Sequence, residues 1–487
     1  MTPLFARIVV LLSGAAILIV ETLATRLVAP YVGLTLESTT AVIGVALAGI
    51  AGGAALGGRW ADVVAPTRVA AGALAVGGLG VLAVQPLVRV LGPAVGPGPV
   101  AAVLLVAAST LAPVTALAMV TPAVTRARLH TVDGSGAVIG QLSAAGTLGS
   151  LAGTFLTGFV LVALLPVSAI LLVTAGACLL LALLTAASRA HAARVGTTAA
   201  LLAVALVAVP GRCDTDTVHH CARVESDGPS TRVLVLDDLR HSAVDLADPR
   251  HLRFAYTQRF ADAVDTAFPA GQALDAVHLG GGGFTMPRWL AATRAGSRSV
   301  VLEVDRGVVE LGRRELGVDA IPGLDVRIAD ARTALAQLPA ASADLVVGDA
   351  FGARTVPWHL ATAEFVGQVH RVLRPDGVYL LNVIDADPMA LVAAEAATLA
   401  TRFGHVALLV RPDQLAPGGG GNVVLVASDR PLDLGALADR AASRGEPGSV
   451  VDDAAVRALA TGADVLTDDF APTDQLLGGS LWSVLRS

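Results

Sequence analysis

The stretch DAVHLGGGGFTMPRWLAATRAGSRSVVLEVD, residues 275–305, carries the strongest fold signal in this chain. It reads as an apolar strand, four glycines, a helix, a second apolar strand and an acidic end. Glycines after a strand let the backbone approach a ligand closely, and an acid about 20 residues further on commonly holds ribose hydroxyls. The dinucleotide pattern G-x-G-x-x-G is not matched, because its third glycine position holds Thr285 or Met286. The stretch therefore predicts a nucleotide-binding type of fold without identifying the ligand.

Strands and helices alternate along the whole chain from residue 231 onward. A helix is predicted at 252–268, and strands are predicted at 231–238, 241–247, 274–279, 298–303, 324–328, 343–348, 377–383, 404–410 and 422–427. Near-continuous apolar strands separated by helices are typical of a doubly wound, Rossmann-like α/β sheet. Ligands of such sheets bind at the carboxyl ends of the strands, so the candidate site residues are expected there.

Four successive strand ends carry a glycine loop or an acid. In chain order they hold Gly280, Gly281, Gly282 and Gly283, then Glu303 and Asp305, then Asp330 with Ala331, and then Asp349. One such acid is readily explained as a helix cap, whereas four in order favour a ligand site. No lysine or arginine directly follows the glycines to grip a phosphate, so the expected ligand is a nucleoside without a polyphosphate.

The first 210 residues are far more apolar than the rest. Hydrophobic residues make up 54% of the chain, and six runs have the roughly 20 apolar residues that a transmembrane helix needs. These runs are 6–29, 39–57, 68–91, 99–124, 137–164 and 167–187, and a seventh at 197–210 is marginal in length. Many of their residues are Gly or Ala, which let helices pack closely. We therefore expect a multi-pass α-helical membrane domain of six or seven helices, in contact with the lipid bilayer, and not a cleaved signal peptide.

Arginines in alternate loops predict the orientation of these helices. They follow the second, fourth and sixth apolar runs, as Arg59 with Arg68, Arg126 with Arg128, and Arg189 with Arg194. Because cytoplasmic loops carry the excess of basic residues, the N-terminus is predicted to be cytoplasmic. Six spans would then leave the second half of the chain in the cytoplasm, and seven would place it outside. The sequence leaves this choice open, and it predicts a cell-membrane protein in either case.

The second half of the chain is acidic. Residues 211–487 hold 25 arginines against 36 Asp and Glu residues, whereas residues 1–210 hold nine against four. An acidic surface argues against a nucleic-acid partner and is compatible with a cationic substrate.

Two cysteines, Cys213 and Cys221, directly follow the last apolar run, and Cys178 lies inside an earlier one. No second pair completes a four-ligand site, so no metal is expected. The pair would form a disulfide outside the cell and would remain two free thiols inside it. Both readings stay open at this stage.

Several segments together resemble one protein family. LGGGGFTMPR, VLEVD, DAR, DLVVGDAFG and FVGQVHRVLRPDGVYLLNV are similar to the spermidine synthase (aminopropyltransferase) family, which has the S-adenosylmethionine methyltransferase type of fold. LVLDDLRHSAVDLADPRHLRFAY resembles the small β-domain and gatekeeping segment that precede that fold. The whole chain is similar to bacterial proteins that fuse a transporter-like, major-facilitator-type membrane half to such a domain. The resemblance implies a membrane domain at 1–210, a linker and small β segment at 211–272, and a nucleoside-binding domain at 273–487.

The resemblance also implies a reaction. Members of this family move the aminopropyl group of decarboxylated S-adenosylmethionine onto an amine such as putrescine, without a metal. The amine must be neutral before it attacks the carbon beside the sulfonium, so a carboxylate base is needed. By motif match, Glu303 would hold the ribose, Asp330 the adenine amino group, and Asp349 would be the base. Tyr256 would line the amine pocket.

Three positions depart from the family pattern. Gly283 replaces an Asp that grips the aminopropyl amine, Gly352 replaces a second catalytic Asp, and His241 replaces a Gln. Because imidazole accepts a proton near neutral pH, we interpret His241 as a catalytic residue that compensates for a lost carboxylate. Other acids that could substitute are Asp238, Asp385 and Asp387, whereas His219 and His220 are expected at the surface near the membrane and His359 in a capping or packing role.

Three hypotheses follow for the function. The first is a membrane-bound aminopropyltransferase, and the second is another S-adenosylmethionine-dependent transferase, such as a methyltransferase. The third is a non-catalytic ligand-binding module coupled to a transporter-like membrane domain, since fold alone does not fix function. A homodimer is left open.

Overall fold

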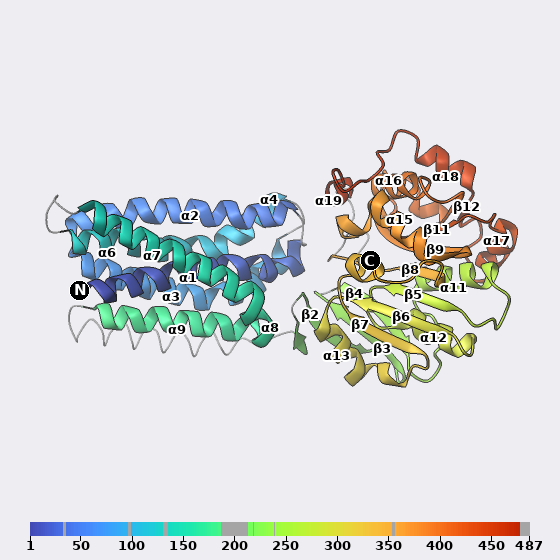
Figure 1. Ribbon diagram of the computed structural model, residues 1–487, viewed down its shortest axis with the longest axis horizontal. Coiled ribbons are helices and arrows are strands. Elements are labelled where there is room, and N and C mark those ends of the chain that lie inside the picture. The colour runs from blue at the N-terminus through green and yellow to red at the C-terminus, as the bar shows by residue number, and fades with distance from the viewer. Residues whose placement is uncertain are drawn as a thin grey trace. The chain divides into compact units, whose positions relative to one another are not determined.

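The protein divides into two compact units, Met1–Arg212 and Cys213–Ser487 (Figure 1). This computed structural model describes residues 1–32, 36–95, 99–129, 135–186, 213–217, 219–237, 239–352 and 356–477. The first unit is helical, and the second contains two β-sheets with helices around the larger one. The division falls close to the predicted end of the membrane domain at residue 210.

The N-terminal unit consists of long apolar helices. Their bounds are α1 Pro3–Val32, α2 Leu36–Val63, α3 Pro66–Leu91, α4 Pro99–Val106, α5 Ala112–Ala118, α6 Val120–Arg128, α7 Ser135–Leu156, α8 Val162–Leu164 and α9 Val167–Thr185. Short π-helical turns join α4 to α5 and α7 to α8. Six of the resulting helical stretches are long and apolar enough to cross a membrane, and they coincide with the six predicted runs. The marginal run at 197–210 lies outside the described residues.

Glycines bring α1 and α7 into close contact. A Cβ at Gly14 would lie 2.6 Å from the Gly146 carbonyl oxygen, and a Cβ at Gly153 would lie 2.5 Å from the Ala15 carbonyl oxygen. Neither position has room for a side chain without moving backbone. The predicted packing role of the small residues is therefore confirmed for this pair of helices.

The main sheet of the C-terminal unit has eight strands in the order β12-β10-β11-β9-β8-β5-β6-β7. Their bounds are β5 Asp275–Leu279, β6 Arg298–Glu303, β7 Leu324–Ile328, β8 Ala343–Gly348, β9 Leu373–Ala386, β10 His405–Leu409, β11 Gly420–Ser428 and β12 Val450–Val451. Neighbouring strands pair in parallel from β7 through β6, β5 and β8 to β9. The remaining pairs, β9–β11, β11–β10 and β10–β12, are antiparallel. The predicted strands are confirmed, in a mixed sheet.

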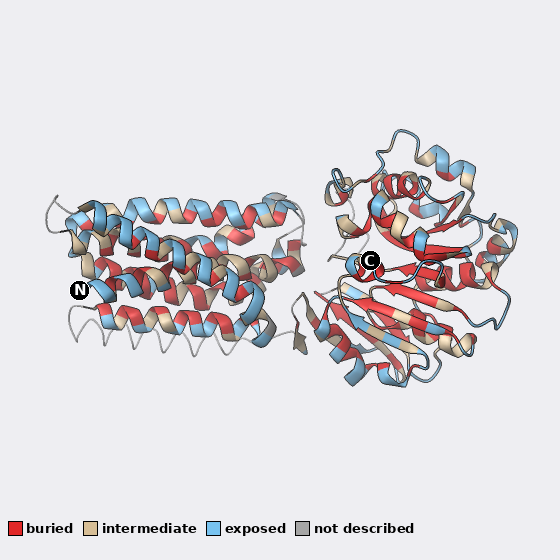
Figure 2. Ribbon diagram, in the orientation of Figure 1, coloured by how far each residue is buried: buried red, intermediate tan, exposed pale blue. Residues whose placement is uncertain are grey.

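Helices cover both faces of the main sheet (Figure 1). One face packs on α14 Ala331–Leu335, α15 Ala363–Val372, α16 Ala390–Leu399 and α18 Asp453–Leu459; the other packs on α11 Ala255–Ala267, α12 Thr285–Thr293 and α17 Leu434–Ser443. Along β8, Val346 packs toward the first face, and Leu345 and Val347 pack toward the second. The strands are consequently buried on both sides (Figure 2). This explains why their sequences read as continuous apolar runs.

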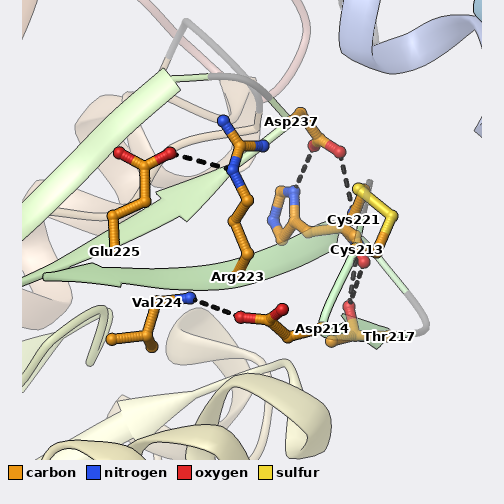
Figure 3. Close-up of a disulfide and its surroundings, with 9 residues drawn as sticks. Cys213, Asp214, Thr217, Cys221, Arg223, Val224, Glu225 and Asp237 are labelled. Atoms are coloured by element: carbon orange, nitrogen blue, oxygen red, sulfur yellow. Dashed lines mark hydrogen bonds and ion pairs between the residues drawn. A yellow bond between two sulfur atoms is a disulfide. The ribbon is translucent and has the colours of Figure 1, made fainter. Parts of the chain in front are cut away.

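A second, smaller sheet precedes the main one. It is antiparallel, in the order β1-β2-β3-β4, with β1 Thr215–Asp216, β2 Cys221–Ser226, β3 Thr231–Leu236 and β4 Leu239–Asp245. Cys213 and Cys221 form a disulfide across its first hairpin (Figure 3). The structure thus selects one of the two readings that the sequence left open for this pair. Cys178 is a free, buried cysteine. The whole small sheet lies within the segment predicted at 211–272.

Candidate functional site

The glycine loop lies between β5 and α12, at the carboxyl end of β5. Gly280 has a φ of +92°, and a Cβ there would lie 2.6 Å from the carbonyl oxygen of Asp349 at the end of β8. Glycine is therefore required at this position by both conformation and space. The next peptide N–H, from Gly281, donates to the Glu303 Oε2 at 2.7 Å. The loop is thus held in place by the acid that ends β6.

Glu303 binds the backbone of two loops with its two carboxylate oxygens. Its Oε1 accepts from the Asp305 N–H at 2.8 Å, while its Oε2 accepts from Gly281. The Gly282 N–H also donates to Oε2, at 3.4 Å. A carboxylate offers about four acceptor positions, so Oε1 is the oxygen that keeps capacity for a further donor such as a ribose hydroxyl. Glu303 is only 8% exposed, and a Cβ at Gly281 would lie 3.2 Å from its Oε2, so a larger residue there would crowd the carboxylate.

Asp305, although adjacent, has a different environment. One of its oxygens accepts from the Gly307 N–H at 2.8 Å and caps α13 Arg306–Glu315. The other accepts from the Thr217 hydroxyl of the small sheet. Asp305 is 1% exposed, and both of its carboxylate oxygens accept hydrogen bonds from protein groups. Its evident contribution is to fix the start of α13 and to tie the small sheet to the end of β6.

Asp330 ends β7 and caps α14. Its Oδ1 accepts from the Thr333 N–H at 3.0 Å, and its Oδ2 lies 3.0 Å from the His359 Nε2. Burial opposes ionisation here, but the hydrogen bonds from Thr333 and His359 prevail and lower the pKa of Asp330. The carboxylate is therefore ionised at neutral pH. Ala331, the next residue, is buried as the first residue of α14.

Asp349, at the end of β8, is held by two side chains. Tyr256 on α11 donates its hydroxyl to Oδ2 at 3.1 Å, and the Asn382 amide on β9 donates to Oδ1 at 2.8 Å. Burial raises the pKa of Asp349 to about 6, against the opposing effect of these two hydrogen bonds. A carboxylate with such a pKa is ionised at pH 7 and is still basic enough to take up a proton. The structure thus brings together Asp349 and Tyr256, which the sequence had proposed for one pocket.

Asn382 was not anticipated from the sequence. It is 1% exposed within β9, and its own carbonyl oxygen accepts from the Asn422 amide of β11 at 3.2 Å. An asparagine in the middle of the apolar run VYLLNV is the signal that could have identified it, because buried polar side chains require partners.

His241, at the start of β4, touches this group through its backbone. The Tyr256 hydroxyl lies 3.4 Å from the His241 carbonyl oxygen. Burial lowers the pKa of the His241 imidazole to about 4, so the ring is neutral at pH 7. The ring itself is 6.3 Å from the ring of His220.

The expectation that His220 is a surface residue is wrong. Its side chain is 11% exposed, and its Nδ1 lies 2.6 Å from the Asp237 Oδ2. The disulfide loop folds back on the small sheet, so that the Cys221 N–H also donates to Asp237 at 2.9 Å (Figure 3). The sequence analysis missed this pair because nothing local to residues 219–221 indicates where the loop packs.

Two of the other acids bind backbone groups. Asp385 accepts from the Ala386 and Val392 N–H groups, and burial raises its pKa to about 6. Asp387 accepts from the Gly418 N–H. Asp238 lies outside the described residues. Within the described ranges, no group of three His, Cys, Asp or Glu residues could hold a metal ion.

Part of the C-terminal unit matches a known protein family. The family described as a methyltransferase domain matches residues 277–381, from β5 into β9. Together with the mixed sheet, this match identifies the unit as a Rossmann-like methyltransferase fold. No curated protein matches the chain.

Solved structures similar to this chain include members of two enzyme groups. A probable spermidine synthase from Corynebacterium glutamicum is 27% identical, with a TM-score of 0.49, over 52% of this chain and 95% of that one. Spermidine synthase from Thermotoga maritima is 20% identical, with a TM-score of 0.31, over 43% and 73%. Human methyltransferase-like protein 13 in complex with SAH is 18% identical, with a TM-score of 0.32, over 45% and 97%.

Proposed function

We propose that the C-terminal unit is an aminopropyltransferase that moves the aminopropyl group of decarboxylated S-adenosylmethionine onto putrescine or a related amine. The single observation that carries the proposal is Asp349. It is a buried carboxyl at the end of β8 with a pKa raised to about 6, oriented by Tyr256 and Asn382. It lies beside the glycine loop, since its N–H donates to the Leu279 carbonyl and its own carbonyl abuts Gly280.

The donor supplies a carbon that the adjacent sulfonium makes electrophilic, and the side chains of this unit supply the base and hold the substrates in place. Asp349 accepts a proton from the acceptor ammonium, and the freed nitrogen lone pair attacks that carbon. The carbon–sulfur bond breaks with its electron pair going to sulfur, which releases methylthioadenosine. Tyr256 and Asn382 keep the carboxylate oriented toward the acceptor. In this proposal Glu303 and the glycine loop hold the ribose, and Asp330 holds the adenine amino group.

A second candidate is methyl transfer from intact S-adenosylmethionine. It is favoured by the match of residues 277–381 to a methyltransferase domain and by the glycines at 283 and 352, where the resemblance leads one to expect acids. Preferential binding of decarboxylated over intact S-adenosylmethionine would count against it.

The proposal places the enzyme at the cell membrane, anchored by its six long apolar helices. The Cys213–Cys221 disulfide then makes the side of the membrane important. Disulfides persist mainly in oxidising compartments, whereas catalysis needs the domain and its adenosyl donor on the same side. Labelling of a Pro229→Cys variant in intact cells reports this side, because Pro229 is exposed in the turn between β2 and β3. Labelling only from outside would favour the non-catalytic ligand-binding module.

The deciding experiment is product release by the full-length protein in detergent. Decarboxylated S-adenosylmethionine and putrescine are supplied, and methylthioadenosine is followed by mass spectrometry. Asp349→Asn is expected to lower turnover by about 10²–10⁴-fold, the range for loss of a general base. The matched control is Asp429→Asn, which alters a half-exposed carboxylate paired with His370 at 2.8 Å. Turnover that Asp349→Asn leaves unchanged would overturn the assigned base, and no release with donor bound would overturn aminopropyl transfer.

A further inference from the structure

Ser242, on β4, occupies the space beside the tip of the glycine loop. Its side chain is 5% exposed, and its hydroxyl has no hydrogen-bond partner among the described residues. A Cβ at Gly283 would overlap the Ser242 Oγ, and a Cβ at Gly282 would lie 3.6 Å from it. Glycine at 283 is therefore required by the serine opposite. A buried hydroxyl without a partner costs free energy, so this one is suited to a ligand group.

The His220–Asp237 pair lies near the same strand, β4. Asp237 accepts from the imidazole at Nδ1, because an ionised carboxylate can only accept. In the neutral ring Nε2 therefore carries a lone pair and can accept a further hydrogen bond. The His241 ring, whose residue precedes Ser242, lies 6.3 Å from the His220 ring.

The disulfide loop, as described at residues 213–217 and 219–221, is docked at the carboxyl end of β6. The Thr217 hydroxyl donates to Asp305, and a Cβ at Gly307 would lie 2.5 Å from the Thr217 Cγ2. The same loop carries His220, and its closing residue Cys221 donates its N–H to Asp237. The loop thus brings an imidazole to the strand end that also carries Glu303, the residue that holds the glycine loop.

The charges at this place favour a cation. Three acids are nearly buried, with exposed fractions of 6% for Asp237, 8% for Glu303 and 1% for Asp305. One imidazole can balance only one of them, and buried negative charge is stabilised by a positive partner. Burial lowers the pKa of His220, but the effects of Asp237, Asp305 and Glu303 outweigh it, so that the pKa is raised overall. These carboxylates favour the protonated ring while the site is empty. A bound ammonium would take the place of that charge, so that the ring binds it in the neutral form, with the Nε2 lone pair as acceptor.

We propose that the Ser242 hydroxyl and the His220–Asp237 pair form a subsite that binds the primary ammonium at the end of the donor's sulfonium-borne chain. This inference rests on the proposed function, because it assumes a donor with its adenosyl group at the glycine loop. The hydroxyl and the imidazole Nε2 accept hydrogen bonds from the ammonium, and Asp237 supplies the opposite charge through the ring. The small sheet thereby selects between chains that end in an ammonium alone and chains that also carry a carboxylate.

The test compares three ligands on the full-length protein in detergent by titration calorimetry. Decarboxylated S-adenosylmethionine carries the ammonium chain, intact S-adenosylmethionine adds a carboxylate, and methylthioadenosine lacks the chain. We expect the wild type to prefer the decarboxylated donor. Ser242→Ala and His220→Gln should each weaken binding of that donor about tenfold, the size of one hydrogen bond to a charged group, with methylthioadenosine unchanged. His370→Gln, at the half-exposed His370–Asp429 pair, is the control and should change none of the three.

The outcomes separate this subsite from the proposed function. Equal weakening of all three ligands, or of none, would overturn the subsite. So would a His220-dependent preference for the intact donor, because the site would then bind a carboxylate. If the donor preference depends on Ser242 and His220 but putrescine yields no methylthioadenosine, the subsite stands and aminopropyl transfer falls. If the wild type turns over putrescine but Ser242→Ala and His220→Gln bind the donor as the wild type does, the proposed function stands and the subsite falls. A wild type that binds none of the three ligands would overturn both.

Discussion

The two sides of the candidate site are built in different ways. On the nucleoside side, Glu303 holds the glycine loop across 22 residues of chain, within one strand–helix–strand unit. On the proposed amine side, which would bind the amino groups of donor and acceptor, Tyr256 reaches Asp349 across 93 residues, and Thr217 reaches Asp305 across 88. The first side follows from parallel strands whose ends meet at one edge. The second depends on a separate small sheet and its disulfide loop, so it can change its chemistry without altering the nucleoside side.

The largest effect on ligand binding is expected on the proposed nucleoside side, from Glu303→Gln. The amide nitrogen of Gln would face either the Gly281 or the Asp305 N–H, so one donor would lose its acceptor. Because hydrogen bonds to a charged group are also lost, affinity for methylthioadenosine should fall by about 100-fold. Calorimetry measures this directly. Unchanged affinity would show that the glycine loop does not need its acid, and the contrast between the two sides would fail.

On the amine side, activity should depend on pH through Asp349, the proposed base for the acceptor. Its pKa is about 6 in the folded protein, so the basic form disappears as the pH falls below that value. We expect kcat/KM to fall about tenfold per pH unit below about 6 and to level off above it. The unfolded carboxyl titrates near pH 4. Its raised folded pKa therefore contributes stability that is present below about pH 4 and lost as the pH rises through about 6. The residual activity of Asp349→Asn should not show the fall in kcat/KM below about pH 6.

Gly283→Ala tests the contact between the two sides. The added methyl group would overlap the Ser242 Oγ, so the loop or β4 must shift. Affinity for decarboxylated S-adenosylmethionine and for methylthioadenosine should each fall by roughly fivefold to tenfold, in the range that overpacking costs. Ser242→Gly in the same chain removes the overlap and should restore the affinity for methylthioadenosine, which does not use the serine. Failure of this restoration would mean that the glycine is needed for some other contact.

Removing the disulfide should have a smaller effect on binding. Cys213→Ser with Cys221→Ser frees a loop that is still held by Thr217 and by the hydrogen bond that the Val224 N–H donates to Asp214, shown in Figure 3. Affinity for the decarboxylated donor should fall about threefold to fivefold, since a displaced His220 loses part of one hydrogen bond. The free energy of unfolding should fall by roughly 2–3 kcal/mol, as for a short disulfide loop. A loss of methylthioadenosine affinity alone would contradict the division between the two sides.

Much of the fold could be predicted from sequence because its signals are local. The apolar runs of β5 to β11 predict buried strands, and the glycines after β5 predict a close backbone approach. Acids at the ends of β6, β7 and β8 predict one shared edge. The six apolar helices follow in the same way from their length and composition. In each case a residue's environment is set by neighbours a few positions away.

The roles of individual acids needed the three-dimensional structure. Glu303 and Asp305 are two residues apart in sequence, yet one holds the glycine loop and the other caps α13 and binds Thr217. Their different environments arise because a loop nearly 90 residues earlier packs on one of them.

Three further features depend on contacts between distant segments of the chain. Asn382 orients Asp349 only because β9 lies beside β8, and Ser242 explains Gly283 only because β4 passes the glycine loop. The His220–Asp237 pair forms only because the disulfide loop folds back on β2 and β3. Strand periodicity and residue type specify each segment by itself. Which side chains meet is set by burial of the small sheet against the larger domain, a long-range packing event that no local pattern encodes.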